Sequence, residues 1–279
     1  MKTNSNIVLL ACILFITQQF LACRKDNSYS NNLNANSNDN SVNTLPVDSS
    51  LVLWLPFTKG SLRDMSGHHN NVVFCSATPA ASRVGRDSTA YYFDGQSSYK
   101  EVKSRASINP IGSITLAALV KPMGFYQGQC HSNRILNKGD DDNANGRIAL
   151  GFDDQPYWHY TGCNKRVNET REYFYGTYGN GTSASGATDT DHIRVDKWYD
   201  LVYTYDGSVS KLYVNGILKM SVNMPTSFTP SNFPLYIGKT QNPQFPYYFT
   251  GIIDDVRIYN RALSPDEILT LNGKMGLDN

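Results

Sequence analysis

The segment from Gly251 to Ile268 constrains the fold of this chain most, because it contains a strand pattern, a turn and a capped helix in direct succession. Side chains alternate from Ile252 to Tyr259 with the period of two that is typical of a strand. The alternation places Asp254 on one face with Ile252, Val256 and Ile258. A carboxylate in an aliphatic row is costly unless it is paired, so we expect Asp254 to be buried, inward-facing and hydrogen-bonded.

A short helix is predicted directly after this strand. Ser264 has the position of an N-cap, Pro265 that of the first helical residue and Glu267 that of the partner in a capping box. The chain therefore ends in a strand followed by a capped helix.

The body of the chain consists of short apolar runs separated by Gly, Asn and Pro, which predicts an all-β sandwich or barrel. Asn215-Gly216 predicts a tight hairpin, because both turn positions require a positive φ. The predicted strands are Leu51–Phe57, Tyr91–Asp94, Tyr99–Lys103, Ile114–Lys121, Arg134–Lys138, Arg147–Phe152, Tyr157–Thr161, Glu172–Tyr178, Trp198–Tyr205, Lys211–Val214, Ile217–Val222, Leu235–Gly238 and Gly251–Tyr259.

Eight short motifs stand in the order found in one known family. They are Trp54-Leu-Pro-Phe57, Asp64-Met-Ser-Gly67, Tyr92-Phe-Asp-Gly95 with Tyr99, Ile114-Thr-Leu116 leading to Val120-Lys-Pro122, Trp198 with Tyr205-Asp-Gly207, Leu212-Tyr-Val-Asn-Gly216, Leu235-Tyr-Ile-Gly238, and Gly251-Ile-Ile-Asp254 through Leu263-Ser264 and Glu267-Ile268. Over residues 50 to 273 the chain resembles LamG-like jelly-roll domains of the concanavalin A-like lectin and glucanase superfamily. The resemblance implies a two-sheet antiparallel jelly-roll β-sandwich with a short C-terminal helix. The superfamily includes lectins, adhesins, glycanases and spacers, so function must come from the site.

The N-terminus resembles a bacterial lipoprotein signal over residues 1–22. Met1-Lys2 is followed by an apolar run too short to span a bilayer, and then by Phe20-Leu-Ala-Cys23. Cys23 is then the lipid-bearing first residue of the mature chain, anchored in the outer membrane; an ordinary secretory peptide with an incidental Cys is the alternative. Arg24-Lys-Asp26 resembles the export tag of surface lipoproteins of Bacteroidota. Residues 23–48, rich in Asn and Ser, are predicted to be a disordered tether before a domain at 49–279.

Three cysteines remain after Cys12 and Cys23 are set aside. An odd number permits at most one disulfide bond within the mature chain. Cys130 and Cys163 flank a run of predicted hairpins, so their pairing would join a meander and leave Cys75 spare. Three buried free thiols are the alternative.

The sequence offers little for catalysis. Glucanases of the resembled superfamily use two Glu on one strand, but this chain has four Glu, and the one near pair, Glu169 and Glu172, would face opposite sides of a strand. Asp189 and Asp191 lie in an Asn- and Thr-rich loop and are interpreted as solvated. His residues at 68, 69, 131, 159 and 192 lack zinc-site spacing. We therefore predict a protein that is not an enzyme.

One loop resembles the start of a calcium-binding loop. Asp141, Asn143 and Asn145 offer oxygen donors at alternate positions before Gly146, but Phe152 stands where an EF-hand would have its bidentate Glu. Calcium is thus a possible cofactor, and a hairpin turn without metal is the alternative.

Aromatic residues supply the candidate ligand site. A sugar offers a C–H face and hydroxyl groups, so it needs an exposed ring with polar neighbours. The densest segments contain Tyr157, Trp158, His159 and Tyr175, of which Trp158 and Tyr175 are predicted to be exposed. With a formal net charge of +1, a nucleic-acid partner is not indicated. The sequence thus predicts a lipid-anchored module that binds a glycan, with binding of an extracellular protein as the alternative.

Overall fold

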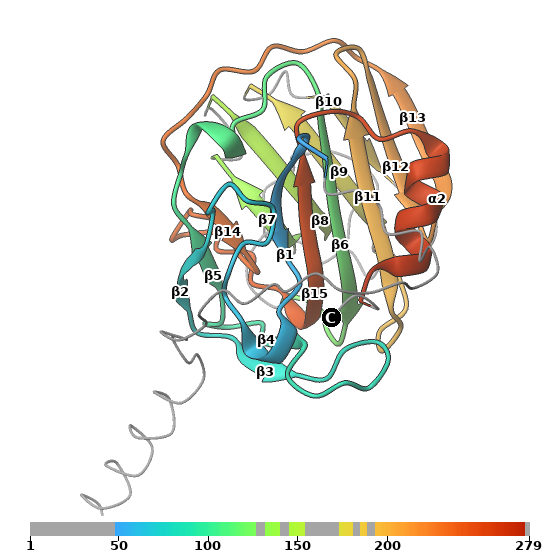
Figure 1. Ribbon diagram of the computed structural model, residues 1–279. Coiled ribbons are helices and arrows are strands. Elements are labelled where there is room, and N and C mark those ends of the chain that lie inside the picture. The colour runs from blue at the N-terminus through green and yellow to red at the C-terminus, as the bar shows by residue number, and fades with distance from the viewer. Residues whose placement is uncertain are drawn as a thin grey trace, which may run out of the picture.

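The computed structural model describes residues 48–126, 132–139, 145–153, 173–180, 185–188 and 193–276. Two antiparallel sheets pack face to face (Figure 1). This arrangement confirms the predicted jelly-roll sandwich with its C-terminal helix. The predicted signal segment, Cys23, the tether up to residue 47 and the predicted strand Tyr157–Thr161 lie outside the described residues.

The first sheet has eight described strands, and β1 Leu51–Leu55 joins it by pairing with β15. The other seven follow in spatial order as β13 Ile217–Asn223, β12 Val209–Val214, β11 Tyr199–Tyr205, β6 Ile114–Pro122, β15 Thr250–Tyr259, β4 Ala90–Asp94 and β3 Thr78–Ala80. The second sheet has seven described strands. Their order is β10 Ser185–Thr188, β9 Tyr173–Gly179, β8 Arg147–Asp153, β7 Ser132–Lys138, β14 Leu235–Ile237, β5 Lys100–Val102 and β2 Val72–Cys75.

The Asn215-Gly216 hairpin is confirmed. Asn215 has a φ of 52° and Gly216 a φ of 75°, and they join β12 to β13. Residues such as Asn and Gly tolerate this left-handed region, which matches the twist of the two strands. The local sequence therefore determines this turn.

Strand β15 differs from the prediction in which side chains face the core. Its register with β6 shifts between Asp254 and Arg257, and Asp255 has a φ of 43°, which marks a β-bulge. The extra residue reverses the alternation, so Ile253 joins Val256 and Ile258 in the core between the sheets. The predicted face of Ile252 and Asp254 was therefore wrong, although Asp254 is completely buried as expected.

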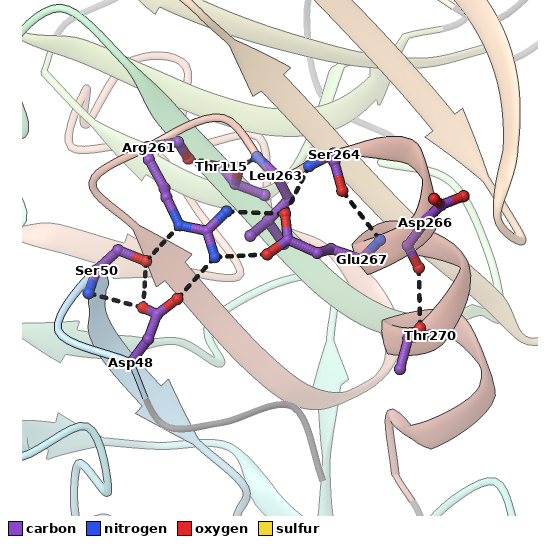
Figure 2. Close-up of polar contacts among 9 residues, drawn as sticks. All are labelled: Asp48, Ser50, Thr115, Arg261, Leu263, Ser264, Asp266, Glu267 and Thr270. Atoms are coloured by element: carbon purple, nitrogen blue, oxygen red, sulfur yellow. Dashed lines mark hydrogen bonds and ion pairs between the residues drawn. The ribbon is translucent and has the colours of Figure 1, made fainter. Parts of the chain in front are cut away.

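The C-terminal helix α2, Pro265–Lys274, covers the outer face of the eight-stranded sheet (Figure 1). Ile268, Leu271 and Met275 of this ending pack in one buried cluster with outward residues of the sheet, which include Leu119, Val202 and Tyr213. The predicted capping box is confirmed, because Ser264 and Glu267 exchange both hydrogen bonds (Figure 2). No helix among the described residues is long and apolar enough to cross a membrane.

Cys75 at the end of β2 is disulfide-bonded. Its interpretation as the spare cysteine was therefore wrong. Cys130 and Cys163 both lie outside the described residues. Three cysteines permit one disulfide bond, so a bond from Cys75 to either of them would exclude the predicted Cys130–Cys163 pair.

Candidate functional site

The outer face of the seven-stranded sheet presents a row of side chains that crosses six strands. Directly opposed residues of antiparallel strands point to the same face, and the register opposes one residue of each strand to the next. From β2 to β9 the row is Phe74, Glu101, Tyr236, Asn137, Ala149 and Thr177. This face lies opposite the core, and α2 lies on the other sheet. Phe74, Glu101 and Tyr236 are at least partly exposed, whereas Asn137, Ala149 and Thr177 are buried. The half of the row on β2, β5 and β14 is therefore a candidate surface for a ligand.

Three aromatic rings gather at the β2 end of the row, and we call them the aromatic platform. Phe74 stacks on Tyr99 with ring centroids 4.6 Å apart, and Tyr99 meets the edge of Tyr236 at 5.8 Å. Phe74 is 44% exposed, and the two tyrosines are half-buried. The aromatic platform is thus a partly exposed apolar surface.

Lys239 and Glu101 accompany the aromatic platform. The Lys239 ammonium lies 3.9 Å from the centroid of Tyr99 and 4.7 Å from that of Tyr236, both within cation–π range. Partial burial lowers the pKa of Lys239, and the charge of Glu101 opposes this shift. One ammonium and one carboxylate offset each other here, and both are suited to hydrogen-bond hydroxyl groups.

At the β9 end, Arg134 lies between two tyrosine rings. Its guanidinium carbon is 5.1 Å from the centroid of Tyr175 and 5.0 Å from that of Tyr247. Tyr175 is placed by Gly151, because a Cβ at Gly151 would lie 2.8 Å from the Tyr175 hydroxyl. Arg134 and Tyr175 are 4% and 6% exposed, so this end of the face is buried.

Three polar atoms on the buried end have no hydrogen-bond partner in the described part of the chain. They are Asn137 Oδ1, Tyr175 Oη and Thr177 Oγ1. Asn137 does use its amide nitrogen, which donates to the carbonyl of Gly139 at 2.9 Å. Buried polar groups are nearly always hydrogen-bonded, so this grouping on one face is unusual.

The predicted ligand residues are only partly placed. Tyr175 lies on the candidate face, but it is buried against Arg134 and Gly151, so its predicted exposure was wrong. Tyr157, Trp158 and His159 lie outside the described residues, in the connection between β8 and β9.

The predicted calcium residues are likewise divided. Asn145 is exposed just before β8, whereas Asp141 and Asn143 lie outside the described residues. No cluster of metal-ligating His, Cys, Asp or Glu occurs among the residues that the structure describes.

Asp64 and Asp94 have structural roles. Asp94 Oδ1 accepts three backbone N–H bonds of 2.8 to 2.9 Å, from residues 96 to 98. Burial alone would raise the pKa of Asp94, but these donors lower it overall. Asp64 accepts the backbone N–H groups of Trp54, Ser66 and Asn70. These carboxylates hold turns and are not free for a ligand.

In β15 the buried carboxylate with the hydrogen bonds described here is Asp255, which the sequence analysis did not single out. It accepts hydrogen bonds from Trp54 Nε1 at 3.0 Å, from Arg257 at 2.7 Å twice, and from the N–H of Gly276 at 3.0 Å. Asp254 lies nearby, since a Cβ on Gly276 would be 3.1 Å from its Oδ2. The carboxylates of Asp254 and Asp255 therefore lie at the end of α2, on the other sheet from the candidate face.

The aromatic platform was not predicted from the sequence. The predicted site consisted of aromatic residues that are close in sequence, whereas Phe74, Tyr99 and Tyr236 come from three segments and meet across strands. The sequence signal was weak, because the residue between Tyr99 and Glu101 is a lysine, Lys100, which the structure buries.

A family profile described as the concanavalin A-like lectin/glucanases superfamily matches residues 94–269, more than half of the chain. A search of curated proteins gave no match.

Many solved structures are similar in fold. Domain 4 of AbnA, an extracellular arabinanase from Geobacillus stearothermophilus, in complex with arabinotriose, has a TM-score of 0.60 and 19% identity, with 80% of this chain and 98% of that chain covered. The binding domain of Paraclostridial Mosquitocidal Protein 1 has a TM-score of 0.61 and 16% identity, with 81% and 52% covered. The binding domain of Botulinum Neurotoxin DC, in complex with SialylT, has a TM-score of 0.57 and 14% identity, with 82% and 52% covered. The chain spans about half the length of these two toxin domains. By its profile match and its fold, the chain belongs to the concanavalin A-like lectin/glucanases superfamily.

Proposed function

We propose that this protein binds carbohydrate on the outer face of its seven-stranded sheet and performs no chemistry. The observation that supports the proposal is the exposed aromatic platform with Lys239 and Glu101 beside it. The C–H face of a sugar ring packs on an aromatic ring, and its hydroxyl groups hydrogen-bond to charged or amide side chains. An arabinotriose-bound domain among the similar structures supports the same class of ligand.

The absence of catalysis is part of this proposal. Hydrolysis of a glycosidic bond needs a pair of carboxyl groups, one on each side of that bond. Beside the platform, the described residues supply Glu101 without a second carboxylate in its row. If the purified protein released reducing sugar from any polysaccharide of a panel, the proposed absence of catalysis would be contradicted.

Affinity electrophoresis of the purified protein in gels with neutral and acidic polysaccharides, arabinan included, tests the binding. We expect retardation by at least one polysaccharide and about a tenfold loss of affinity, about 1.4 kcal/mol, in Phe74→Ala and Tyr236→Ala. Tyr92→Ala is the matched control, because Tyr92 is 36% exposed but lies on β4 of the other sheet. If no polysaccharide retards the protein and it captures a defined extracellular protein, the alternative of binding an extracellular protein would be favoured.

We also propose that the module is held at the outer membrane by a lipid on Cys23. The N-terminal sequence supports this. Mass spectrometry of the N-terminal peptide, with Cys23→Ser as control, tests it, and an unmodified Cys23 would contradict it.

Calcium at Asp141, Asn143 and Asn145 remains a proposal based on their spacing. A metal bound by the folded state alone should make the melting temperature fall in excess chelator. An unchanged melting curve would contradict the calcium site. Peptide mapping without reductant will identify whether Cys130 pairs with Cys163.

A further inference from the structure

We infer that Glu101 is the specificity-determining residue of the aromatic platform and restricts it to glycans without acidic groups. This inference rests on the proposed function and names the class of sugar that the partly exposed half of the row takes. A neutral sugar is bound there through its hydroxyl groups, whereas a uronate or a sulfated sugar is repelled.

Glu101 lies at the centre of the aromatic platform. On β5 it is directly opposite Phe74 of β2 on one side and Tyr236 of β14 on the other. Burial raises the pKa of Tyr99 and that of Tyr236, and the charge of Glu101 adds to both shifts, so the carboxylate lies near both tyrosines. The Glu101 side chain is half-buried. A ligand that packs on these rings must therefore come close to the Glu101 carboxylate.

The Glu101 carboxylate is not used within the part of the chain that the structure describes. No described residue donates a hydrogen bond to it or forms an ion pair with it. In this it differs from Asp94, whose carboxylate accepts three backbone N–H groups. An ionised carboxylate accepts hydrogen bonds and cannot donate them, so its ligand must donate. Sugar hydroxyl groups can do so, whereas ionised carboxyl and sulfate groups cannot.

Lys239 does not cancel this selection. Its ammonium lies 3.9 Å from the ring centroid of Tyr99 and 4.7 Å from that of Tyr236, so it is held by the two rings. An acidic group of a ligand could pair with Lys239 only beside the Glu101 carboxylate, whose charge reaches the ammonium. Like charges placed side by side disfavour binding and are a source of specificity. The platform therefore selects against anions although it contains a lysine.

Affinity electrophoresis with matched polysaccharides tests the role of Glu101. Each neutral polysaccharide of the panel, arabinan first, is compared with a partly carboxymethylated preparation of the same polymer. The unaltered protein should bind the neutral form at least about tenfold more tightly. In Glu101→Gln, which keeps the size of the side chain and removes its charge, this ratio should fall to about one. The ratio of the unaltered protein should also shrink at about 1 M salt, where the Debye length is about 3 Å.

Asp87→Asn is the matched control. It changes the net charge by the same amount, but Asp87 is exposed between β3 and β4 of the other sheet. This variant should keep the ratio of the unaltered protein, and melting curves of both variants check that they are folded.

Two results would overturn the role of Glu101 and leave sugar binding intact. In the first, the unaltered protein binds the carboxymethylated form as tightly as the neutral form. In the second, Glu101→Gln keeps the preference for the neutral form. If no polysaccharide in either form retards the protein, the proposed function and the role of Glu101 fall together.

Discussion

Arg261 donates two hydrogen bonds to the carboxylate of Glu267, of 2.8 Å from Nη1 and 2.7 Å from Nη2 (Figure 2). The same guanidinium donates to Asp48 at 2.7 Å and to Ser50 at 2.9 Å. One side chain thus connects the first described residue of the sandwich to the N-terminus of α2. Because Glu267 also closes the capping box, the ion pair and the helix cap share one carboxylate.

Replacing Arg261 should destabilise the sandwich at both ends of the domain. We expect Arg261→Ala to lower the free energy of unfolding by about 1–2 kcal/mol, because a paired, partly exposed guanidinium contributes modestly and here it acts in a network. Urea denaturation measures the loss. Arg63→Ala is the control, since Arg63 is exposed and its backbone N–H, which the substitution keeps, makes its hydrogen bond to Ser61. Equal stability of the two variants would contradict a stabilising role for Arg261.

The Glu267 carboxylate should make stability depend on acidic pH. Hydrogen bonds from Arg261 lower the pKa of Glu267 from 4.5 to about 2. A depressed pKa in the folded state means that the stabilisation is present above pH 4.5 and is lost as the pH falls toward 2. The difference in melting temperature between the protein and Glu267→Gln should therefore shrink over this interval. A difference that stays constant from about pH 6 to about pH 2 would contradict this.

Asp200 should have the opposite effect. Burial raises the pKa of Asp200 to about 7, and the guanidinium of Arg83, 3.1 Å away, opposes the rise, while the charge of Asp255 adds to it. A raised pKa in the folded state means that this group reduces stability as the pH increases from 3.8 to 7. Asp200→Asn removes the titrating carboxyl and therefore the decline. The melting temperature of the protein should fall relative to that of the variant as the pH rises from about 4 to about 8, and a constant difference would contradict the shift.

Local features of the fold were predictable because they depend on residues that are close in sequence. The Asn215-Gly216 turn and the Ser264 cap follow from the backbone and side-chain chemistry of a few adjacent residues. The bulge in β15 was not predictable in this way, because Asp255 adopts a left-handed φ without being glycine. Its conformation is explained by contacts with Trp54 and Arg257 that form only in the assembled sandwich.

The candidate site was less predictable than the fold for a related reason. Three short strands, β2, β3 and β10, were not predicted, and the first of these contributes Phe74. The platform also depends on the register between strands that are distant in sequence, as between Phe74 and Glu101. Periodicity indicates which way a side chain points, but it does not indicate its neighbour on the next strand.

The packing of the two sheets should be most sensitive at Gly176 of β9. A Cβ at this position would lie 2.3 Å from Cγ of Tyr203, a buried ring on β11 of the opposite sheet. Overpacking of a core costs about 1–3 kcal/mol, so Gly176→Ala should lower the free energy of unfolding by about this amount. Gly273→Ala is the matched control, because Gly273 lies in α2 and a methyl group added there would meet no atom of another part of the domain within 4 Å. There alanine should stabilise the helix by up to about 1 kcal/mol. Urea denaturation of both variants measures the contrast, and a Gly176→Ala protein as stable as the unaltered one would show that the two sheets can separate locally without cost.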